Sequence, residues 1–525
     1  MTHRGVVAFL LVVSACGPSR SSSGNVDAFT DHDHDGYSVE GGDCNDDDPA
    51  IHPDVSETCG DGIDNNCNGN VDTADYDCFT PCQKATADRS SVGCVYYAVD
   101  TNSIGQPWAV AISNVDQAAT ANVVIEAKTG TTWAPVAGGT ITVGPRALKT
   151  VALPRKFTTG SALMAGGAFR ITSDIPVISY QFAPIDGSQS FLSDASLLLP
   201  VSAFDRYYIV SAWPSGIDQG GTARDAHIQI VASEPTNVTI TSPVATTAGA
   251  TAAALAPNVP HTYAMNDGDY LQLTVQTINQ SLTGTYIESD KPVALFSSND
   301  CANVPNTPDA CCCDHLEEQI FGLQTWGTSY VGAQMPKRGN EGAVWQILAQ
   351  QDGTTVTFTP GAGVTGLPPT VTLGARQKME FTVSGGATPG DFLISSDKPI
   401  LVNQFTVGSF TVQNGGDTGD PDMVQAIPTE QYLAHYNVLV PGTWINDFLV
   451  LIRKTGATVM VDGIAPGTTW RPLAGGWETT VMPVPDGEHV LDGSAPFGVA
   501  VSGYDSFDSY SYPGGLGQAV INPIF

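Results

Sequence analysis

Short runs of alternating apolar and polar residues follow one another along most of the chain, from about Tyr96 to the C-terminus. Typical examples are HIQIVA at 227–232 and TVTFT at 355–359. A period of two places the apolar side chains on one face of a β-strand. Turn signals such as Asp352-Gly353 separate the runs. The pattern therefore predicts a mostly β protein built from short strands.

One pattern recurs four times. A Ser-Asp-x-Pro motif has its proline at positions 176, 292 and 399, and a degraded copy has its proline at 496. An upstream strand recurs in step, as Asn122–Glu126, Asn237–Thr241, Thr355–Thr359 and Thr458–Asp462. Two signals in step indicate four copies of a unit of roughly 100 residues, the size of a β-sandwich. We expect the proline to begin a strand and the aspartate before it to form a turn.

These units predict the organisation of the chain. The expected fold is mostly β, with an array of about four β-sandwich-like units after a small irregular segment rich in Asp and Cys. The predicted parts are a signal peptide at 1–15, a tether at 16–30, the Asp/Cys-rich segment at 31–95, and β units at 96–195, 196–312, 313–420 and 421–525.

Negative charge is concentrated in the Asp/Cys-rich segment. Residues 21–83 contain sixteen carboxylates and no Lys or Arg, which is half of the formal net charge of −32. Like charges at this density repel and cannot form a core, so cations must neutralise them or the segment is a disordered linker. The acidic balance also argues against a nucleic-acid partner, whose phosphates need clustered Lys and Arg.

Two loops in this segment have the ligand spacing of calcium sites. The first places side chains or a carbonyl at positions 1, 3, 5 and 7, with a late carboxylate after position 12; these residues are Asp31, Asp33, Asp35, Tyr37 and Asp43. The second has Asp64, Asn66, Asn68, Asn70, Asp72 and Asp75 at positions 1, 3, 5, 7, 9 and 12. Oxygen ligands predominate, so calcium is the predicted cofactor. The alternative is a transition metal bound by His32, His34 and His52.

The same segment resembles a bacterial metal-binding motif repeat. The matching residues are Asp33–Tyr37, Asp43–Asp46, Asp48–Pro53, Glu57–Cys59 and Asp64–Gly69. Asn45, Asn66 and Asn68 stand where that pattern usually has Asp, which lowers the expected affinity.

The N-terminus predicts export and a lipid anchor. His3 and Arg4 precede an apolar run at Val6–Val13, which is too short to span a bilayer. Val13-Ser14-Ala15-Cys16 resembles the lipobox of bacterial lipoproteins, which implies cleavage before Cys16 and lipid attachment to its sulfur. The alternative is an ordinary signal peptide. We expect a protein anchored in the bacterial outer membrane and exposed at the cell surface.

The cysteine count agrees with export. The chain has eleven cysteines, and removing Cys16 leaves an even number, which predicts disulfides in an oxidising compartment. Six lie near the front with their pairing open: Cys44, Cys59, Cys67, Cys78, Cys82 and Cys94. The other four are Cys301, Cys311, Cys312 and Cys313.

Residues 185–445 carry a second set of motifs, with looser similarity across 96–525. They are Leu199–Ser202, Tyr207-Tyr208, Thr283–Thr285, Ser289–Val293, Cys301–Pro305, Cys313–Gln319, Asp352–Thr357 and Gly416–Asp422. They resemble the IgGFc-binding protein N-terminal domain family. The resemblance implies a surface β-rich module for binding or adhesion and a Cys301–Cys313 disulfide. Cys311 and Cys312 depart from the family pattern and leave their own pairing open.

No common catalytic motif occurs, so we do not expect an enzyme. The one cluster that could form a metal or acid–base site is Asp314–Glu318, which includes His315, and a hydrolase ranks third among the functions. Trp108, Trp345, Trp444 and Tyr504 could be carbohydrate platforms, although aromatic residues at strand spacing are more often core.

The leading hypothesis is a non-enzymatic, lipid-anchored surface protein. A calcium-stabilised stalk would present the β units for adhesion to, or binding of, an extracellular protein or glycan. The alternative is a structural scaffold of the cell envelope without a specific ligand.

Overall fold

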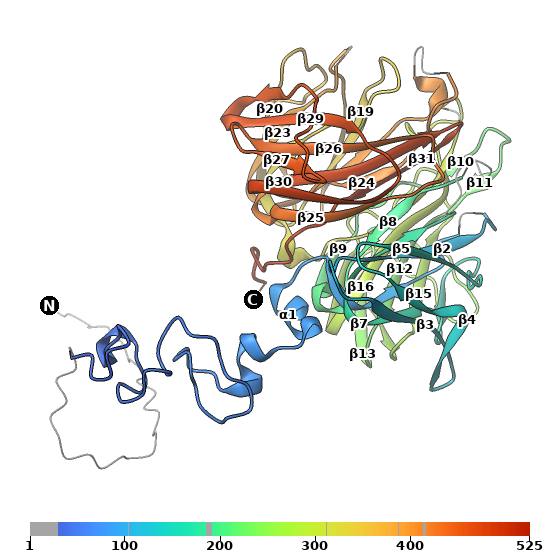
Figure 1. Ribbon diagram of the computed structural model, residues 1–525. Coiled ribbons are helices and arrows are strands. Elements are labelled where there is room, and N and C mark those ends of the chain that lie inside the picture. The colour runs from blue at the N-terminus through green and yellow to red at the C-terminus, as the bar shows by residue number, and fades with distance from the viewer. Residues whose placement is uncertain are drawn as a thin grey trace, which may run out of the picture. The chain divides into compact units, whose positions relative to one another are not determined.

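The computed structural model describes residues 30–102, 104–184, 192–310, 312–386, 388–412 and 416–524 (Figure 1). The chain divides into an acidic part that ends at Thr80 and a β-rich part that begins at Pro81. The acidic part ends before the predicted limit at residue 95. The reason is that α1 (Pro81–Asp88) is joined to β1 (Gly93–Ala98) by the Cys82–Cys94 disulfide. Among the described residues no helix has the length and apolar character needed to cross a membrane.

The acidic part has little regular structure and almost no apolar core. Its described elements are the short 3₁₀ turns η1 (Val39–Gly41), η2 (Asp72–Ala74) and η3 (Tyr76–Cys78). Ile51, at 5% exposed, is the buried apolar side chain among its described residues. A chain this short cannot stabilise itself by hydrophobic burial alone. Disulfides and neutralisation of its charge must therefore hold it together.

The strands of the β-rich part form four sandwiches, at 93–198, 205–319, 327–425 and 433–513. Each is organised around one long strand: β7 (Phe169–Phe182), β16 (Tyr286–Ala302), β23 (Phe392–Phe405) or β30 (Gly487–Asp505). In the first sandwich the first half of β7 pairs with β1 and β3, and its second half pairs with β2 and β8. Apolar side chains from both halves share one buried cluster, so the curled sheet closes as a sandwich. The predicted fold class is confirmed.

The remaining strands complete the four sandwiches. The first contains β2 (Trp108–Asn114), β3 (Ala121–Thr129), β4 (Thr132–Val143), β5 (Leu148–Leu153) and β8 (Ala195–Leu198). The second contains β9 (Asp205–Ile209), β12 (Ala226–Ala232), β13 (Thr236–Thr241), β14 (His261–Met265), β15 (Tyr270–Val275), β17 (Asp314–Gln319) and the added β6 (Ala162–Met164). The third contains β18 (Gly327–Gly332), β19 (Ala343–Ala349), β20 (Thr354–Pro360), β21 (Val371–Leu373), β22 (Lys378–Val383) and β24 (Met423–Gln425). The fourth contains β25 (Leu433–Val440), β26 (Asn446–Lys454), β27 (Val459–Val461), β28 (Arg471–Leu473), β29 (Trp477–Pro483) and β31 (Asp508–Pro513).

The Ser-Asp-x-Pro motif lies in the middle of each long strand, so the prediction that its proline begins a strand is wrong. In β7, pairing with β3 ends at Ser173 and pairing with β2 begins at Val177. The same gap in pairing recurs at 290–292, 397–399 and 494–496. A proline costs little at such an irregularity because no ladder hydrogen bond needs its N–H. The gap is where each long strand passes from one half of its sandwich to the other.

A buried tyrosine hydroxyl closes this gap in all four sandwiches. It donates a hydrogen bond of 2.5–2.7 Å to the carbonyl of the residue after the proline. The pairs are Tyr96 with Val177, Tyr208 with Val293, Tyr330 with Ile400, and Tyr436 with Phe497. Each tyrosine is at most 2% exposed. The hydroxyl therefore satisfies a carbonyl that would otherwise be buried without a partner.

The aspartate of the motif binds the start of the strand that carries the second repeated signal. Asp174 accepts from the Asn122 N–H at 2.7 Å, and Asp397 accepts from the Thr355 N–H at 2.7 Å. In the degraded fourth copy, the Ser494 hydroxyl accepts from the Thr458 N–H at 2.9 Å. The two repeated signals are therefore in contact, which explains why they recur in step along the chain.

The last strands of the sandwiches, β8, β17, β24 and β31, are here called the closing strands. Each contacts the next, and β31 contacts β8 (Figure 1). All of their residues are buried. The predicted limits at 195/196, 312/313 and 420/421 fall within or just before these strands, because each closing strand pairs with the long strand that precedes it.

We predict that Tyr208→Phe lowers the free energy of unfolding by about 1–3 kcal/mol, because it leaves the buried Val293 carbonyl without a donor. The matched control is Tyr207→Phe, which changes a half-buried neighbour whose hydroxyl makes no hydrogen bond among the described residues. Urea unfolding of the two variants, followed by tryptophan fluorescence, checks the prediction. Equal midpoints for the two variants would contradict it.

Candidate functional site

The first acidic loop, residues 31–46, gathers carboxylates into two overlapping groups. The ligand atoms of each group lie within 4.8 Å of one another, and the groups are Asp31, Asp33 and Asp46, and Asp33, Asp35 and Asp43. Backbone N–H groups orient the first carboxylate, since His34 and Gly36 donate to Asp31 at 2.7 and 3.1 Å. Gly36 adopts a φ of +104°, which favours glycine and makes the tight turn possible. Tyr37 follows the turn, and its N–H donates to Asp35 at 2.8 Å.

Several of these carboxylates have one buried oxygen that accepts no hydrogen bond from the described residues. These oxygens are the Oδ2 atoms of Asp33, Asp35, Asp43 and Asp46. Burial, with repulsion from neighbouring carboxylates, raises the pKa of Asp33 above its usual value. A hard divalent cation would accept these oxygens as ligands and would remove the repulsion between them. The donor set of this loop therefore fits a calcium-type ion.

The histidines of the transition-metal alternative lie outside these groups. His34 Nδ1 bonds the Asp31 carbonyl at 3.0 Å. The His52 ring stacks on Tyr37, with its Nε2 4.0 Å from an Asp35 oxygen. His32 lies 3.5 Å from the exposed Asp47. In the described part of the acidic segment, only carboxylates form the converging groups, so the geometry favours oxygen ligands.

The second acidic loop, residues 64–75, closes on itself through its own side chains. Asp64 accepts from the N–H of Asn68 at 3.1 Å, and Asp75 Oδ2 accepts from the side-chain amides of Asn66 and Asn68 at 3.0 and 2.7 Å. Asn70 also bonds Asn68, through Nδ2 at 3.1 Å. These hydrogen bonds hold Asp64, Asn66, Asn68, Asn70 and Asp75 together in one loop.

Asp72 is directed away from the second loop. Its carboxylate accepts from the N–H groups of Gly60 and Gly62, at 2.5 and 3.1 Å. The second loop thus has fewer carboxylates facing one another than the first, and it stays a predicted cation site.

Two carboxylates of the acidic part match the metal-binding motif in sequence, but sequence reasoning assigned them no ligand role. Asp46 belongs to a converging group, but it begins the run Asp46–Asp48, in which spacing alone cannot select one residue. Glu57, at 7% exposed, accepts from the Asn65 and Asp72 N–H groups at 2.9 Å each. It connects the stretch before the second loop to the middle of that loop, and no ligand spacing points to it.

Disulfides staple both parts of the chain. Cys44–Cys67 joins the two acidic loops, and Cys59–Cys78 joins the stretches that flank the second loop. Cys301–Cys313, the pair that the family resemblance implies, links β16 to the segment before β17. Cys312 is also disulfide-bonded, whereas Cys311 and the predicted lipidation site Cys16 lie outside the described residues.

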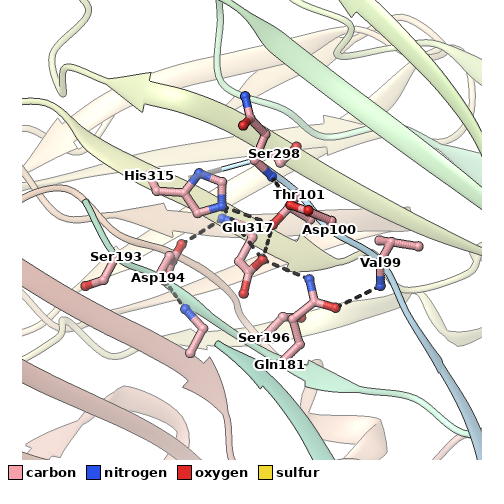
Figure 2. A network of polar contacts seen from close by, with 12 residues as sticks. Val99, Asp100, Thr101, Gln181, Ser193, Asp194, Ser196, Ser298, His315 and Glu317 are labelled. Carbon is pink, nitrogen blue, oxygen red and sulfur yellow. Dashed lines mark hydrogen bonds and ion pairs between the residues drawn. The ribbon is translucent and has the colours of Figure 1, made fainter. Parts of the chain in front are cut away.

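The cluster at 314–318 forms part of a buried network on β17. His315 Nε2 lies 3.1 Å from the Thr101 hydroxyl and 3.7 Å from Glu317 Oε2 (Figure 2). The same Glu317 oxygen accepts from Gln181 Nε2 at 2.9 Å. All four residues are at most 1% exposed. The network therefore ties the second sandwich to the first and presents no surface to a substrate.

Carboxyl groups gather around the closing strands. Burial raises the pKa of Asp194, Asp314 and Glu318 well above their usual values, and further carboxylates nearby add to the rise. Burial also raises the pKa of Asp420 and of Asp422 to about 6. At pH 5 the Asp420 and Asp422 carboxyl groups, with a pKa of about 6, are therefore mostly protonated.

The aromatic residues considered as carbohydrate platforms are core. Trp108, Trp345, Trp444 and Tyr504 are at most 4% exposed. Large apolar side chains do reach the surface in the third and fourth sandwiches, where Phe410 and Ile445 are 67% and 76% exposed.

Comparison with known proteins matches both parts of the chain. The family model described as "IgGFc binding protein" matches residues 194–503, and the one described as "Putative metal-binding motif" matches residues 43–73. The human protein named IgGFc-binding protein is 25% identical over 270 residues, which is 49% of this chain and 5% of the human protein. The chain thus corresponds to a small fraction of that relative. No solved structure matches the chain.

The sandwiches, the disulfides and the acidic loops together define a disulfide-bonded β-protein with an acidic segment that matches a metal-binding motif. The chain belongs to the IgGFc binding protein family, whose model covers more than half of it, from β8 into β30. The two resemblances drawn from the sequence over 185–445 and 31–77 are confirmed.

We predict that Asp33→Asn weakens calcium binding at least tenfold, because Asp33 contributes to both carboxylate groups of the first loop. The wild-type site should bind with a dissociation constant of roughly 10⁻⁴–10⁻³ M, as extracellular calcium modules do. Isothermal titration of the full chain with calcium measures the dissociation constants of the wild type and of Asp33→Asn. Asp47→Asn is the control because the Asp47 side chain is 86% exposed. Equal affinities in Asp33→Asn and Asp47→Asn would contradict this assignment.

We also predict that stability falls as pH rises from 5 to 8. The folded-state pKa of Asp422, about 6, lies above the unfolded value of roughly 3.9, so the folded chain holds protons that the unfolded chain releases. This contribution is full below the unfolded pKa and is lost as pH rises through 6. Asp422→Asn should reduce the loss between pH 5 and 8 by about 1–2 kcal/mol, whereas the exposed Asp309→Asn should leave it unchanged. Urea unfolding at several pH values checks the slope, and a slope unaffected by Asp422→Asn would refute the prediction.

Proposed function

We propose that this chain is a lipid-anchored binding protein of the bacterial cell surface. Cys16 would carry the lipid in the outer membrane, and the acidic part would bind calcium and act as a stiff spacer. The sandwiches would bind an extracellular protein or glycan. The observation that carries the proposal is the family match over 194–503, which includes β8 of the first sandwich and most of the other three.

The disulfides support an extracytoplasmic location for the working protein. Four of them have both cysteines among the described residues, and such bonds persist in oxidising compartments. The enclosed His315 network supports binding rather than catalysis, because its side chains are buried and shielded from solvent.

Calcium suits the role of a spacer. Without a cation, the converging carboxylates of the first loop repel one another and favour an expanded chain. With calcium bound, the loop and the Cys44–Cys67 disulfide would fix both acidic loops as one short rigid segment.

Exposed apolar side chains are the places where we expect the partner to contact the sandwiches. Phe410 lies in η7 (Ser409–Thr411), and Ile445 precedes β26. Covering a large apolar side chain with a partner removes its surface from water, which stabilises the complex. Aromatic side chains are also enriched at binding hot spots.

We expect the full chain, immobilised through its N-terminus, to capture a reproducible ligand from a panel of human IgG Fc, secreted glycoproteins and arrayed glycans. Phe410→Ser combined with Ile445→Ser should weaken that binding at least tenfold, while Asp33→Asn should leave its affinity unchanged. Surface plasmon resonance measures these affinities. Self-assembly of the chain without capture of any panel member would instead support a structural scaffold and sink the binding role.

A separate experiment tests the anchor. Cys16→Ser should abolish incorporation of labelled fatty acid and move the protein from the membrane fraction to the medium or the soluble fraction of the envelope. Protease added to intact cells should remove the wild-type protein from the surface. A Cys16→Ser variant that keeps the label would contradict lipid attachment at this cysteine.

A further inference from the structure

Three metal-ligating side chains converge in the second sandwich, away from the acidic loops. Asp225 precedes β12, His227 lies in β12, and Asp300 lies in β16. Their ligand atoms lie within 4.8 Å of one another. The site is in the β-rich part, outside the residues that match the metal-binding motif.

Sheet geometry places the three side chains on one face. β12 and β16 pair antiparallel, with Ala226 opposite Asn299, and the Asp300 N–H donates to the Asp225 carbonyl at 3.0 Å. Asp225 and Asp300 are therefore opposite each other across the strand pair. His227 is two residues from Asp225, and side chains two apart in a strand share a face. The register of this strand pair thus builds the cluster.

Each of the three side chains is oriented by its own neutral partner. The Thr274 hydroxyl lies 2.9 Å from His227 Nδ1, and Gln276 Nε2 donates to Asp225 Oδ2 at 2.8 Å. Asn102 Nδ2 donates to Asp300 Oδ1 at 2.8 Å. Metal-binding histidines and carboxylates commonly have such outer partners, which fix ring and carboxylate orientation.

The imidazole faces the carboxylates. His227 is 1% exposed, and its Nε2 lies 3.0 Å from Asp300 Oδ1. When Nδ1 carries the proton and donates it to Thr274, Nε2 directs its lone pair at the carboxylates. Asp225 and Asp300 are only partly buried, so the cluster is open to solvent on one side.

The net negative charge of the cluster also favours binding of a cation. Two carboxylates meet one imidazole, and Arg224, the cation next to Asp225 in sequence, is bound by Asp218 at 2.6 Å. One nitrogen and two carboxylate ligands suit zinc and other first-row divalent ions, whereas calcium prefers a shell of oxygens.

We propose that Asp225, His227 and Asp300 bind a divalent transition metal, with zinc as the best fit to the donor set. The three side chains supply the protein ligands, and the open side leaves one position for water. The site lies at the junction of the first and second sandwiches, because Asn102 donates a hydrogen bond to Asp300. Phe157 packs edge-on against His227, with the ring centroids 5.7 Å apart. Bound metal thus fixes the Asp300 carboxylate, to which Asn102 of the first sandwich donates a hydrogen bond.

The chain contains a matched control for a histidine–carboxylate pair without a third ligand. His489 is 4% exposed, and its Nδ1 lies 2.7 Å from Asp462 Oδ2. Its other nitrogen bonds the Pro485 carbonyl at 2.7 Å. In the described part of the chain this pair belongs to no group of three converging ligands.

The test uses the full chain, stripped of metal with a chelator and saturated with calcium to fill the acidic loops. We expect one equivalent of zinc to bind in isothermal titration, and cobalt to bind with visible absorption bands that report a nitrogen ligand. His227→Gln and Asp225→Asn should each weaken zinc at least tenfold, and Thr274→Val should weaken it by a factor of about 10 or more. His489→Gln and Asp33→Asn should bind zinc like the wild type.

Three results would overturn the proposal: no zinc binding by the wild type, unchanged zinc affinity in His227→Gln, or loss of the cobalt bands in Asp33→Asn. If His227→Gln fails to fold, Asp225→Asn decides the matter, because Asp225 is only partly buried and its replacement keeps the shape of the side chain. Zinc should also raise the thermal midpoint of the wild type and not that of Asp225→Asn. An equal rise in both would count against the site.

Discussion

The hydrogen bond from a buried tyrosine to the carbonyl after the proline is the contact on which each sandwich depends. A strand that serves two halves of a sandwich must leave one set of partners before it joins the next, and Asp-x-Pro occupies that gap. The proline removes an N–H donor where none is needed, and the tyrosine supplies a donor where a carbonyl would lack one. The fourth copy has lost the aspartate but keeps Tyr436 bonded to Phe497. The tyrosine contact is thus common to all four copies.

The two parts of the chain are stabilised by different physics. The sandwiches bury apolar side chains on strand faces, and their closing strands add polar side chains that bond one another across the junctions, as Gln425 Nε2 does to Glu318 Oε1 at 3.2 Å. In the described residues of the acidic part, Ile51 is the buried apolar side chain, so hydrophobic burial stabilises this part little. Its order depends on Cys44–Cys67, Cys59–Cys78 and the neutralisation of carboxylates that face one another.

The repeat and the first acidic loop could be predicted from the sequence because both rest on local spacing. The proline motif and the upstream strand recur in step since Asp174 and Asn122 are in contact, and the loop is read from alternate positions and a glycine turn. The position of Pro176 within a strand could not be predicted. A proline lacks an N–H donor, and this is tolerated equally at the start of a strand and at a gap in pairing. The roles of Tyr208 and His227 depend on partners that lie far away in the sequence. The role of Asp46 could not be selected by spacing among the adjacent carboxylates. Only strand register brings Asp300 to His227, and register is a property of the folded sheet.

Hydrogen exchange of the full chain, followed by mass spectrometry with and without calcium, tests most directly whether a cation orders the acidic part. The account predicts that calcium slows exchange across residues 31–46, where N–H groups such as those of His34 and Gly36 bond the ligand carboxylates. Exchange in the sandwiches should be unchanged. Identical exchange of residues 31–46 in calcium and in chelator would contradict the account.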